Sequence, residues 1–316
     1  MKRFLDQVPL AICGLILGII SIGNLFFSMQ NYILGWTFTS MGLILMLPFI
    51  LRIITMGKGF LKSLEDPVTA AVLAAFPMAM MILCTIMSRF TEYGTLITVV
   101  WWMAVILHFA MLTLFIFYFV IPHRFKSDYL HPGWFIPFVG IAMVSITSTN
   151  FSIEFGRIVF WIALIFAVVL LPIVIGKMIK DNPSRQSFPL AATLATPGSI
   201  CLAAYISVMS PPSVGMVYGL LILSQLLYLV TLILIPKMLK PEFYASYASL
   251  TFPLAISATA LNNTLNVKGL DGTLKSILEV LSTIEQYIVV IIIIYILVRY
   301  IWFLGQSYTE SSQSRD

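Results

Sequence analysis

The stretch QSFPLAATLATPGSICLAAYISVMSPPSVGMVYGLLILSQLLYLVTLILIP, residues 186–236, contains no Asp, Glu, Lys or Arg. Residues 7–51 form a second stretch of the same kind. A helix that crosses a membrane needs about 20 apolar residues, so each stretch is long enough for two crossings. These two stretches predict an integral membrane protein built from helices.

The composition of the whole chain agrees with this class. Of its 316 residues, 60% are hydrophobic and 10% are charged, and the mean hydropathy is +1.00. Soluble domains carry roughly 25% charged residues. We therefore predict an all-α membrane protein, with residues 1–316 as a single domain and short tails at both ends. Breaks in the apolar runs place ten transmembrane helices at residues 8–29, 32–55, 67–88, 95–120, 132–151, 155–179, 188–209, 212–236, 244–265 and 284–304.

Basic residues are distributed unequally between the two sides of such a bundle. With ten alternating helices, one side collects 14 of the 18 Lys and Arg residues and the other side collects 4. Because basic loops stay inside, both termini are predicted to be cytoplasmic, in a cell (inner or plasma) membrane. The net charge of +5 follows from this bias and does not indicate nucleic-acid binding. The larger set is Lys2, Arg3, Arg52, Lys58, Lys62, Arg124, Lys126, Lys177, Lys180, Arg185, Lys237, Lys240, Arg299 and Arg315.

Four prolines lie inside apolar segments, at Pro77, Pro137, Pro197 and Pro253, with separations of 60, 60 and 56 residues. They fall in the third, fifth, seventh and ninth predicted helices, which all run outward from the cytoplasm. A proline bends a helix and frees a backbone group, which a membrane tolerates chiefly beside protein or a water-filled path. The spacing therefore predicts five parallel hairpins whose bent odd helices surround a central path. The alternative is that membrane helices are simply rich in proline.

Several short motifs, in order along the chain, resemble those of one membrane-protein family. VPLAICG at 8–14, followed by Gly18, resembles its opening helix, and HP at 131–132 leading into FIP at 135–137 resembles the start of its fifth. ATP at 195–197 through AYIS at 204–207 resembles its seventh helix, and TFP at 251–253 its ninth. The chain is thus similar to the tellurite-resistance/dicarboxylate transporter family, which includes bacterial tellurite-resistance channels and plant guard-cell slow anion channels.

This resemblance implies a central pore within the five hairpins and a homotrimer with one pore in each subunit. The TFP segment matches the part of the family that carries a pore-occluding phenylalanine, which implies that Phe252 is the gate. Phe76 also directly precedes a helical proline and is the second candidate.

Polar side chains in the odd helices suggest how anions would pass. These helices carry no Asp, Glu, Lys or Arg between their ends, whereas a carrier that grips a dicarboxylate is expected to use buried Arg or Lys. Hydroxyl and amide groups occur instead. Thr259 and Asn263, which follow Phe252 by 7 and 11 residues, lie on the same helical face as Phe252. The alternative is that these groups join helices by hydrogen bonds. The candidates for pore lining are Thr147, Asn150, Ser207, Thr259 and Asn263.

The predicted function is therefore a gated channel that lets small inorganic or dicarboxylate anions cross the lipid bilayer. The alternative is a secondary carrier or exporter of C4-dicarboxylates such as malate, or of oxyanions such as tellurite and sulfite. No enzyme, metal or cofactor is predicted, because no catalytic triad, phosphate-binding loop or metal-ligand spacing occurs. The three cysteines, Cys13, Cys84 and Cys201, lie far apart in apolar segments and are interpreted as packing residues.

Overall fold

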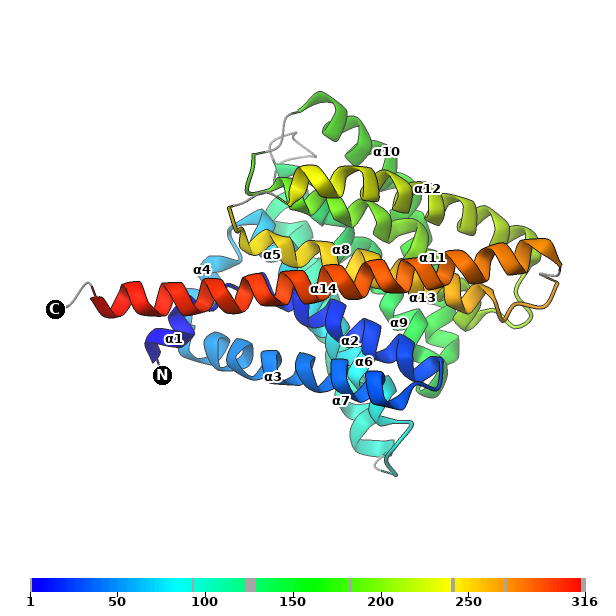
Figure 1. The fold of residues 1–316 in the computed structure, drawn as a ribbon, viewed down its shortest axis with the longest axis horizontal. Coiled ribbons are helices and arrows are strands. Elements are labelled where there is room, and N and C mark those ends of the chain that lie inside the picture. The colour runs from blue at the N-terminus through cyan, green and yellow to red at the C-terminus, as the bar shows by residue number, and fades with distance from the viewer. Residues whose placement is uncertain are drawn as a thin grey trace.

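The computed structural model describes residues 2–92, 94–122, 129–181, 184–239, 242–269 and 272–313. Within these ranges the secondary structure is entirely helical (Figure 1). Four residues of the larger basic set, Arg124, Lys126, Lys240 and Arg315, lie outside the described residues.

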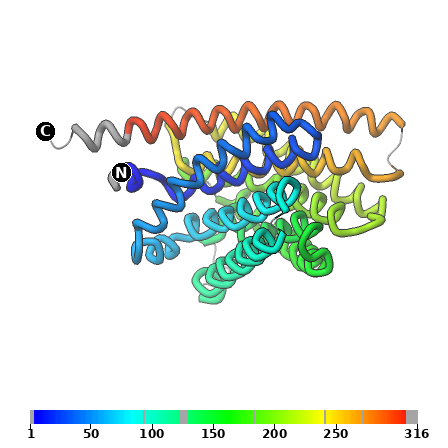
Figure 2. Tube along the Cα trace, turned by 90° about the horizontal axis from the view of Figure 1, so that it is seen from below, coloured from blue at the N-terminus to red at the C-terminus, as the bar shows by residue number. Residues whose placement is uncertain are grey.

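Long helices alternate along the chain with shorter, interrupted segments. The five long helices form the outside of the bundle. They are α3 (Tyr32–Met56), α7 (Gly94–Phe115) with its π-helical end η1 (Ile116–Val120), α10 (Ile153–Lys180), α12 (Val214–Met238) and α14 (Thr273–Gln313). Figure 2 shows α14 running along one side of the molecule.

The interrupted segments form the inside of the bundle. The first is α2 (Ile12–Ser28), and the second consists of α5 (Pro67–Leu73) and α6 (Ala75–Met87). The third consists of η3 (Pro132–Trp134), α8 (Phe135–Phe138), η4 (Val139–Ile141), α9 (Ala142–Thr147) and η5 (Ser148–Asn150). The last two are η6 (Phe188–Ala195) with α11 (Thr196–Val208), and η7 (Ala245–Leu250) with α13 (Thr251–Thr264). Two short helices, α1 (Lys2–Gln7) and α4 (Lys58–Ser63), lie outside these segments.

The two groups of segments differ in how much of their surface is buried. In the inner segments Pro67–Met87, Pro132–Asn150 and Phe188–Val208, 72%, 78% and 89% of the most apolar window is buried. In the outer helices the corresponding share is only 28% to 39%, although these helices are strongly apolar too. An apolar surface that faces neither water nor protein requires lipid, so the outer helices present their exposed side to the bilayer.

Eight helical segments within the described residues are long and apolar enough to cross a membrane. The apolar helix α2 is shorter, at 17 residues. The protein is therefore a multi-pass membrane protein. Both α1 and the last turns of α14 lie at the same end of the molecule, where they contact each other (Figure 1).

The structure changes two expectations about the helices. The last helix begins at Thr273 instead of residue 284, because its first three turns are helical even though they are polar. The four prolines stand at the second or third position of α6, α8, α11 and α13. A proline is well tolerated in the first turn of a helix, where its missing N–H has no partner to lose. Each proline thus starts a new α-helical piece after a turn or a 3-10 stretch.

Candidate ion pathway

The five inner segments form a closed ring of neighbours. Helix α2 packs on α6, α6 on α9, α9 on α11, α11 on α13, and α13 returns to α2. The closing contact is tight, since a Cβ atom added at Gly18 of α2 would lie 2.4 Å from Thr251 Oγ1 and 2.9 Å from the carbonyl carbon of Thr251. None of these five helices contains an Asp, Glu, Lys, Arg or His. The ring is therefore built from uncharged walls.

Side chains join neighbouring ring segments at the end where the backbone is least regular. Each of these donors reaches the main-chain carbonyl of another segment, which satisfies groups that a broken helix leaves free. The bonds are Cys13 Sγ to the Val72 oxygen (3.2 Å), Thr193 Oγ1 to Pro132 (2.7 Å), Ser249 Oγ to Pro189 (2.8 Å) and Thr251 Oγ1 to Gly14 (3.0 Å). They connect α2 to α5, η6 to η3, η7 to η6 and α13 to α2.

The two candidate gate residues occupy equivalent positions but different surroundings. Phe76 and Phe252 are the second residues of α6 and α13, each directly before a proline. The half-buried ring of Phe76 packs on Phe49 of the outer helix α3, with 5.1 Å between ring centroids. Phe252 is only 5% exposed, and no other aromatic ring packs on it among the described residues. The ring of Phe76 thus packs partly on an outer helix through Phe49, whereas Phe252 makes no such aromatic contact.

The orientation of α13 follows from two other side chains. Thr251 donates to α2, and Ser257 faces Glu285 of the outer helix α14. At 100° per residue, Phe252 lies about 140° around the helix from Ser257. Thr259 and Asn263 lie within about 20° of Phe252, because the helix continues without a break to Thr264. The predicted shared face therefore lies about 140° around α13 from the side that faces α14.

The five predicted pore-lining residues do not all lie together. The hydroxyl of Thr147 accepts a hydrogen bond from Trp101 Nε1 of α7 (2.9 Å) and donates to the Met143 carbonyl (2.8 Å). Asn150 donates to Ser88 at the far end of α6 (3.0 Å). These contacts favour the helix-joining alternative for both side chains.

The other three candidates make no side-chain bond to another segment among the described residues. Ser207 donates to Ala203 and Thr259 to Ala255, both one turn back and both at 2.8 Å. Asn263 is half-buried near the end of α13. The amide of Asn263 can donate to an anion directly, whereas the hydroxyls of Ser207 and Thr259 can donate to one only by turning away from their carbonyl partners.

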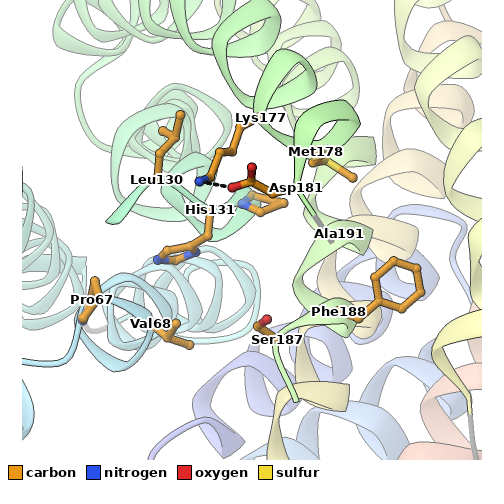
Figure 3. Close-up of a pocket in the computed structure, with 11 residues that line it drawn as sticks. Pro67, Val68, Leu130, His131, Lys177, Met178, Asp181, Ser187, Phe188 and Ala191 are labelled. Atoms are coloured by element: carbon orange, nitrogen blue, oxygen red, sulfur yellow. Dashed lines mark ion pairs between the residues drawn. The ribbon is translucent and has the colours of Figure 1, made fainter. Parts of the chain in front are cut away.

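A cavity of about 250 Å³ lies at the end of the bundle where α10 meets α5, η3 and η6. Figure 3 shows Lys177 of α10 and Asp181, which directly follows α10, pointing toward one another on one side of it, with Pro67 and Val68 of α5 on another. The rest of the lining is mainly apolar, and the opposite charges of Lys177 and Asp181 cancel, so this pair does not make the cavity a strong anion trap. Sequence reasoning did not find this group, since the residues come from four separate segments.

His131 lines the same cavity and begins η3. Its Nδ1 accepts a hydrogen bond from the Gly133 N–H (3.1 Å), so the proton of the neutral ring is on Nε2, which faces the backbone of Pro67. Burial lowers the pKa of His131 to about 4, against the weaker raising effects of the Pro67 backbone and Asp66. The ring is therefore neutral at pH 7 and serves as a cap between η3 and α5.

Apolar walls, an interrupted inner ring and lipid-facing outer helices are typical of a membrane transport protein. Among the described residues, no three His, Cys, Asp or Glu side chains come together as metal ligands. A family model described as voltage-dependent anion channel matches residues 7–301. The chain belongs to the voltage-dependent anion channel family, which confirms the predicted family and places the protein among channels and transporters, not enzymes. None of the curated proteins compared with the chain matches it.

Proposed function

We propose that this protein lets small anions cross the membrane along a path enclosed by the five inner segments, and that Phe252 gates the path. In this proposal the ten helical segments form five parallel hairpins, each with an inner and an outer helix. The observation that carries it is the closed ring of uncharged inner helices. Membership of an anion channel family supports the choice of anions as the transported ions.

The position of Phe252 supports its role as the gate. Its side of α13 lies about 140° around the helix from the side that faces α14, which supports a ring directed toward the inside of the ring of helices. A phenyl ring in a narrow apolar passage blocks ions because it excludes their water. Phe76 is the weaker candidate, since its ring already packs on Phe49.

The polar groups beyond Phe252 support weak, repeated contact with an anion. Thr259 and Asn263 share its helical face, and Ser207 lies on α11, the next inner helix. Conduction requires that binding be weak enough for the ion to leave. Hydroxyl and amide donors meet this requirement, while a buried Lys or Arg would hold the anion.

The decisive experiment measures anion flux into liposomes that contain purified protein, with chloride, nitrate, malate and sulfite compared. We expect Phe252→Ala to raise the flux at least tenfold, because the plug is removed while Pro253 and the helix remain. Phe252→Leu should stay mostly closed, since it still fills the space, and Phe76→Ala should give a smaller rise. A folded Phe252→Ala variant that is as silent as the wild type would refute the gate.

The same flux measurement separates the channel from the carrier. A channel predicts a flux that grows with driving force and far exceeds about 10³ ions per second, which is above typical catalytic turnover. A saturable, slower and proton-dependent flux would favour a carrier of dicarboxylates or oxyanions.

The basic asymmetry supports an orientation with both termini in the cytoplasm. Cysteines placed at Ser63 of α4 and at Glu92 before α7 test this orientation. An impermeant thiol reagent added outside intact cells should label the second position and not the first. Labelling at Ser63 would show that the proposed orientation is wrong. The native cysteines are buried and do not compete for the reagent.

The family resemblance also supports a homotrimer with one path in each subunit. Each subunit then lies against its neighbours through outer helices, whose large exposed apolar side chains include Ile44, Leu47 and Ile54 of α3. Mass measurement of the purified protein in detergent or nanodiscs tests this assembly, and a monomer would exclude it.

A further inference from the structure

One carboxyl group is buried in the middle of the bundle. Glu285 of α14 is 2% exposed and is directed toward α13, on which α14 packs, and toward Gln225 of α12. It faces Gln225 of α12 and Ser257 of α13, and Tyr228 of α12 also lies near it. Gln225 is the twelfth of the 25 residues of α12, so the group lies about halfway along that helix.

The polar atoms of this cluster lack direct partners. Both carboxylate oxygens of Glu285, Gln225 Nε2, Ser257 Oγ and Tyr228 Oη are buried without a hydrogen bond among the described residues. Unsatisfied polar groups are costly inside a membrane protein, and an ionisable one usually marks a function. Gln225 and Ser257 are the side chains placed to donate to this carboxyl group.

Among the side chains that the structure describes, no Lys, Arg or His of a neighbouring helix faces Glu285. From α12 it meets the amide of Gln225 and the phenol of Tyr228, and from α13 the hydroxyl of Ser257. Helix α2, which also packs on α14, contains no Asp, Glu, Lys, Arg, His or Tyr. Helix α1 and η7 pack on α14 further along, where Tyr300 donates to the Ala245 carbonyl. A carboxylate here has no counterion, so the side chain is suited to hold a proton.

We propose that Glu285, with Gln225, Ser257 and Tyr228 around it, is a proton-binding site that controls anion passage along the inner ring. The inference rests on the proposed function, because it assigns a regulator to that path. When Glu285 is protonated, the wall of the path is neutral. When it loses its proton, a negative charge stands behind α13, on the side opposite the face of Phe252.

The size of the effect follows from Coulomb's law. Glu285 and a passing anion are separated by about one helix diameter, roughly 10 Å. At an effective dielectric of about 20, one charge at that distance changes the occupancy of the anion by about tenfold. Flux should therefore rise about tenfold as the pH falls and the carboxylate is neutralised.

The test uses liposomes with equal pH on both sides, from pH 8 to pH 5, and the open Phe252→Ala variant as the reference. Its nitrate flux should rise about tenfold as the pH falls. Adding Glu285→Gln should hold the flux at the acidic level at every pH. Adding Glu279→Gln, an exposed carboxyl on the same helix, should leave the pH response intact. His131 does not titrate in this range, because burial lowers its pKa to about 4.

Two outcomes would overturn the inference while leaving the proposed function in place. One is a conducting reference variant whose flux does not depend on pH. The other is a pH response that Glu285→Gln leaves unchanged. Glu285→Asp provides a second variant, which keeps a carboxyl group and should keep the response with a shifted midpoint.

If no variant conducts at any pH, the proposed function fails and the proton site is tested alone. Infrared difference spectra of the purified protein report the carbonyl stretch of a protonated carboxyl group. A band that titrates between pH 5 and pH 8 and is lost in Glu285→Gln would support the site. Spectra that are identical with and without Glu285 would refute it.

Discussion

The inner segments and the outer helices of this protein are both apolar, but they bury their apolar surface in different ways. An outer helix such as α10 is continuous over 28 residues and exposes most of its surface to lipid. An inner segment such as η6 with α11 changes from 3-10 to α-helix at Pro197 and is almost completely buried. Irregular backbone thus occurs where neighbouring protein can satisfy it, and regular backbone occurs where only lipid is available.

This difference also separates two kinds of side-chain hydrogen bond. On the outer helices, Thr37 and Thr113 donate to carbonyls one turn back within their own helix. On the inner segments, Thr193, Ser249 and Thr251 donate to carbonyls of other segments. Inner hydroxyls therefore help to hold the ring together, and their removal should cost more.

The largest expected effect tests the contrast in packing. Gly18→Leu should prevent α2 from packing on α13, because even a Cβ atom would meet the side chain and backbone of Thr251. We expect a loss of roughly 3 kcal/mol or more and little folded protein, since overpacking against backbone cannot relax. Gly219→Leu on α12 is the matched control, because nothing lies within 4 Å of its Cβ position. Size-exclusion profiles in detergent measure both, and equal yields would contradict the tight inner ring.

A second effect concerns the prolines. Pro197→Ala restores an N–H at the start of α11, which allows the α-helix to extend back into η6. Since 3-10 helix rises about 2.0 Å per residue and α-helix about 1.5 Å, this conversion would shift the end of the segment by several ångströms. We expect the flux of the open Phe252→Ala variant to change several-fold. Pro172→Ala, on the exposed side of α10, should leave the flux unchanged. Equal effects at both sites would mean that the inner prolines have no special role.

A third, smaller effect tests the hydroxyl links. Thr251→Val keeps the shape of the side chain but removes the bonds to Gly14 and Ala248. The expected loss is about 1 to 2 kcal/mol, because a buried carbonyl loses its partner. Thr113→Val, whose bond to Phe109 is exposed and local, should cost close to nothing. Thermal unfolding in detergent compares the two variants. An equal fall in Tm would show that a hydrogen bond between two segments adds no more stability than one within a helix.

Much of the inner and outer arrangement could be predicted from apolar runs. The predicted range 32–55 corresponds to Tyr32–Met56, and 188–209 corresponds to η6 and α11 together. The family was also predicted correctly from short motifs such as TFP at 251–253. These features depend on residues that are close together in the sequence, so they can be predicted from spacing and composition.

Features that depend on distant partners were not predictable. The hydroxyl of Thr147, for example, meets Trp101, which is 46 residues away in the sequence. The last helix was expected to begin at residue 284, because polarity at Lys275 and Glu279 ends the apolar run while helix formation continues. A helix that begins at residue 284 would have Glu285 at the edge of the membrane. For this reason the sequence did not predict that Glu285 is buried among α12, α13 and α14.

The smallest expected effect concerns His131, which caps the inner segment η3. Its pKa is lowered in the folded protein to about 4 from the usual 6.5, so the folded state binds fewer protons than the unfolded state between these values. Stability should therefore fall as the pH decreases through about 6.5 and continue to fall toward 4. His131→Asn keeps an oxygen that can accept the Gly133 N–H and removes the titration. We expect its Tm to lie within a few degrees of the wild type at pH 7.5 and to fall less steeply below pH 6.5. Melting curves in detergent at four pH values provide the measurement. A parallel acid-induced loss in both proteins would show that other groups dominate and that His131 is not the buried cap inferred from its contacts.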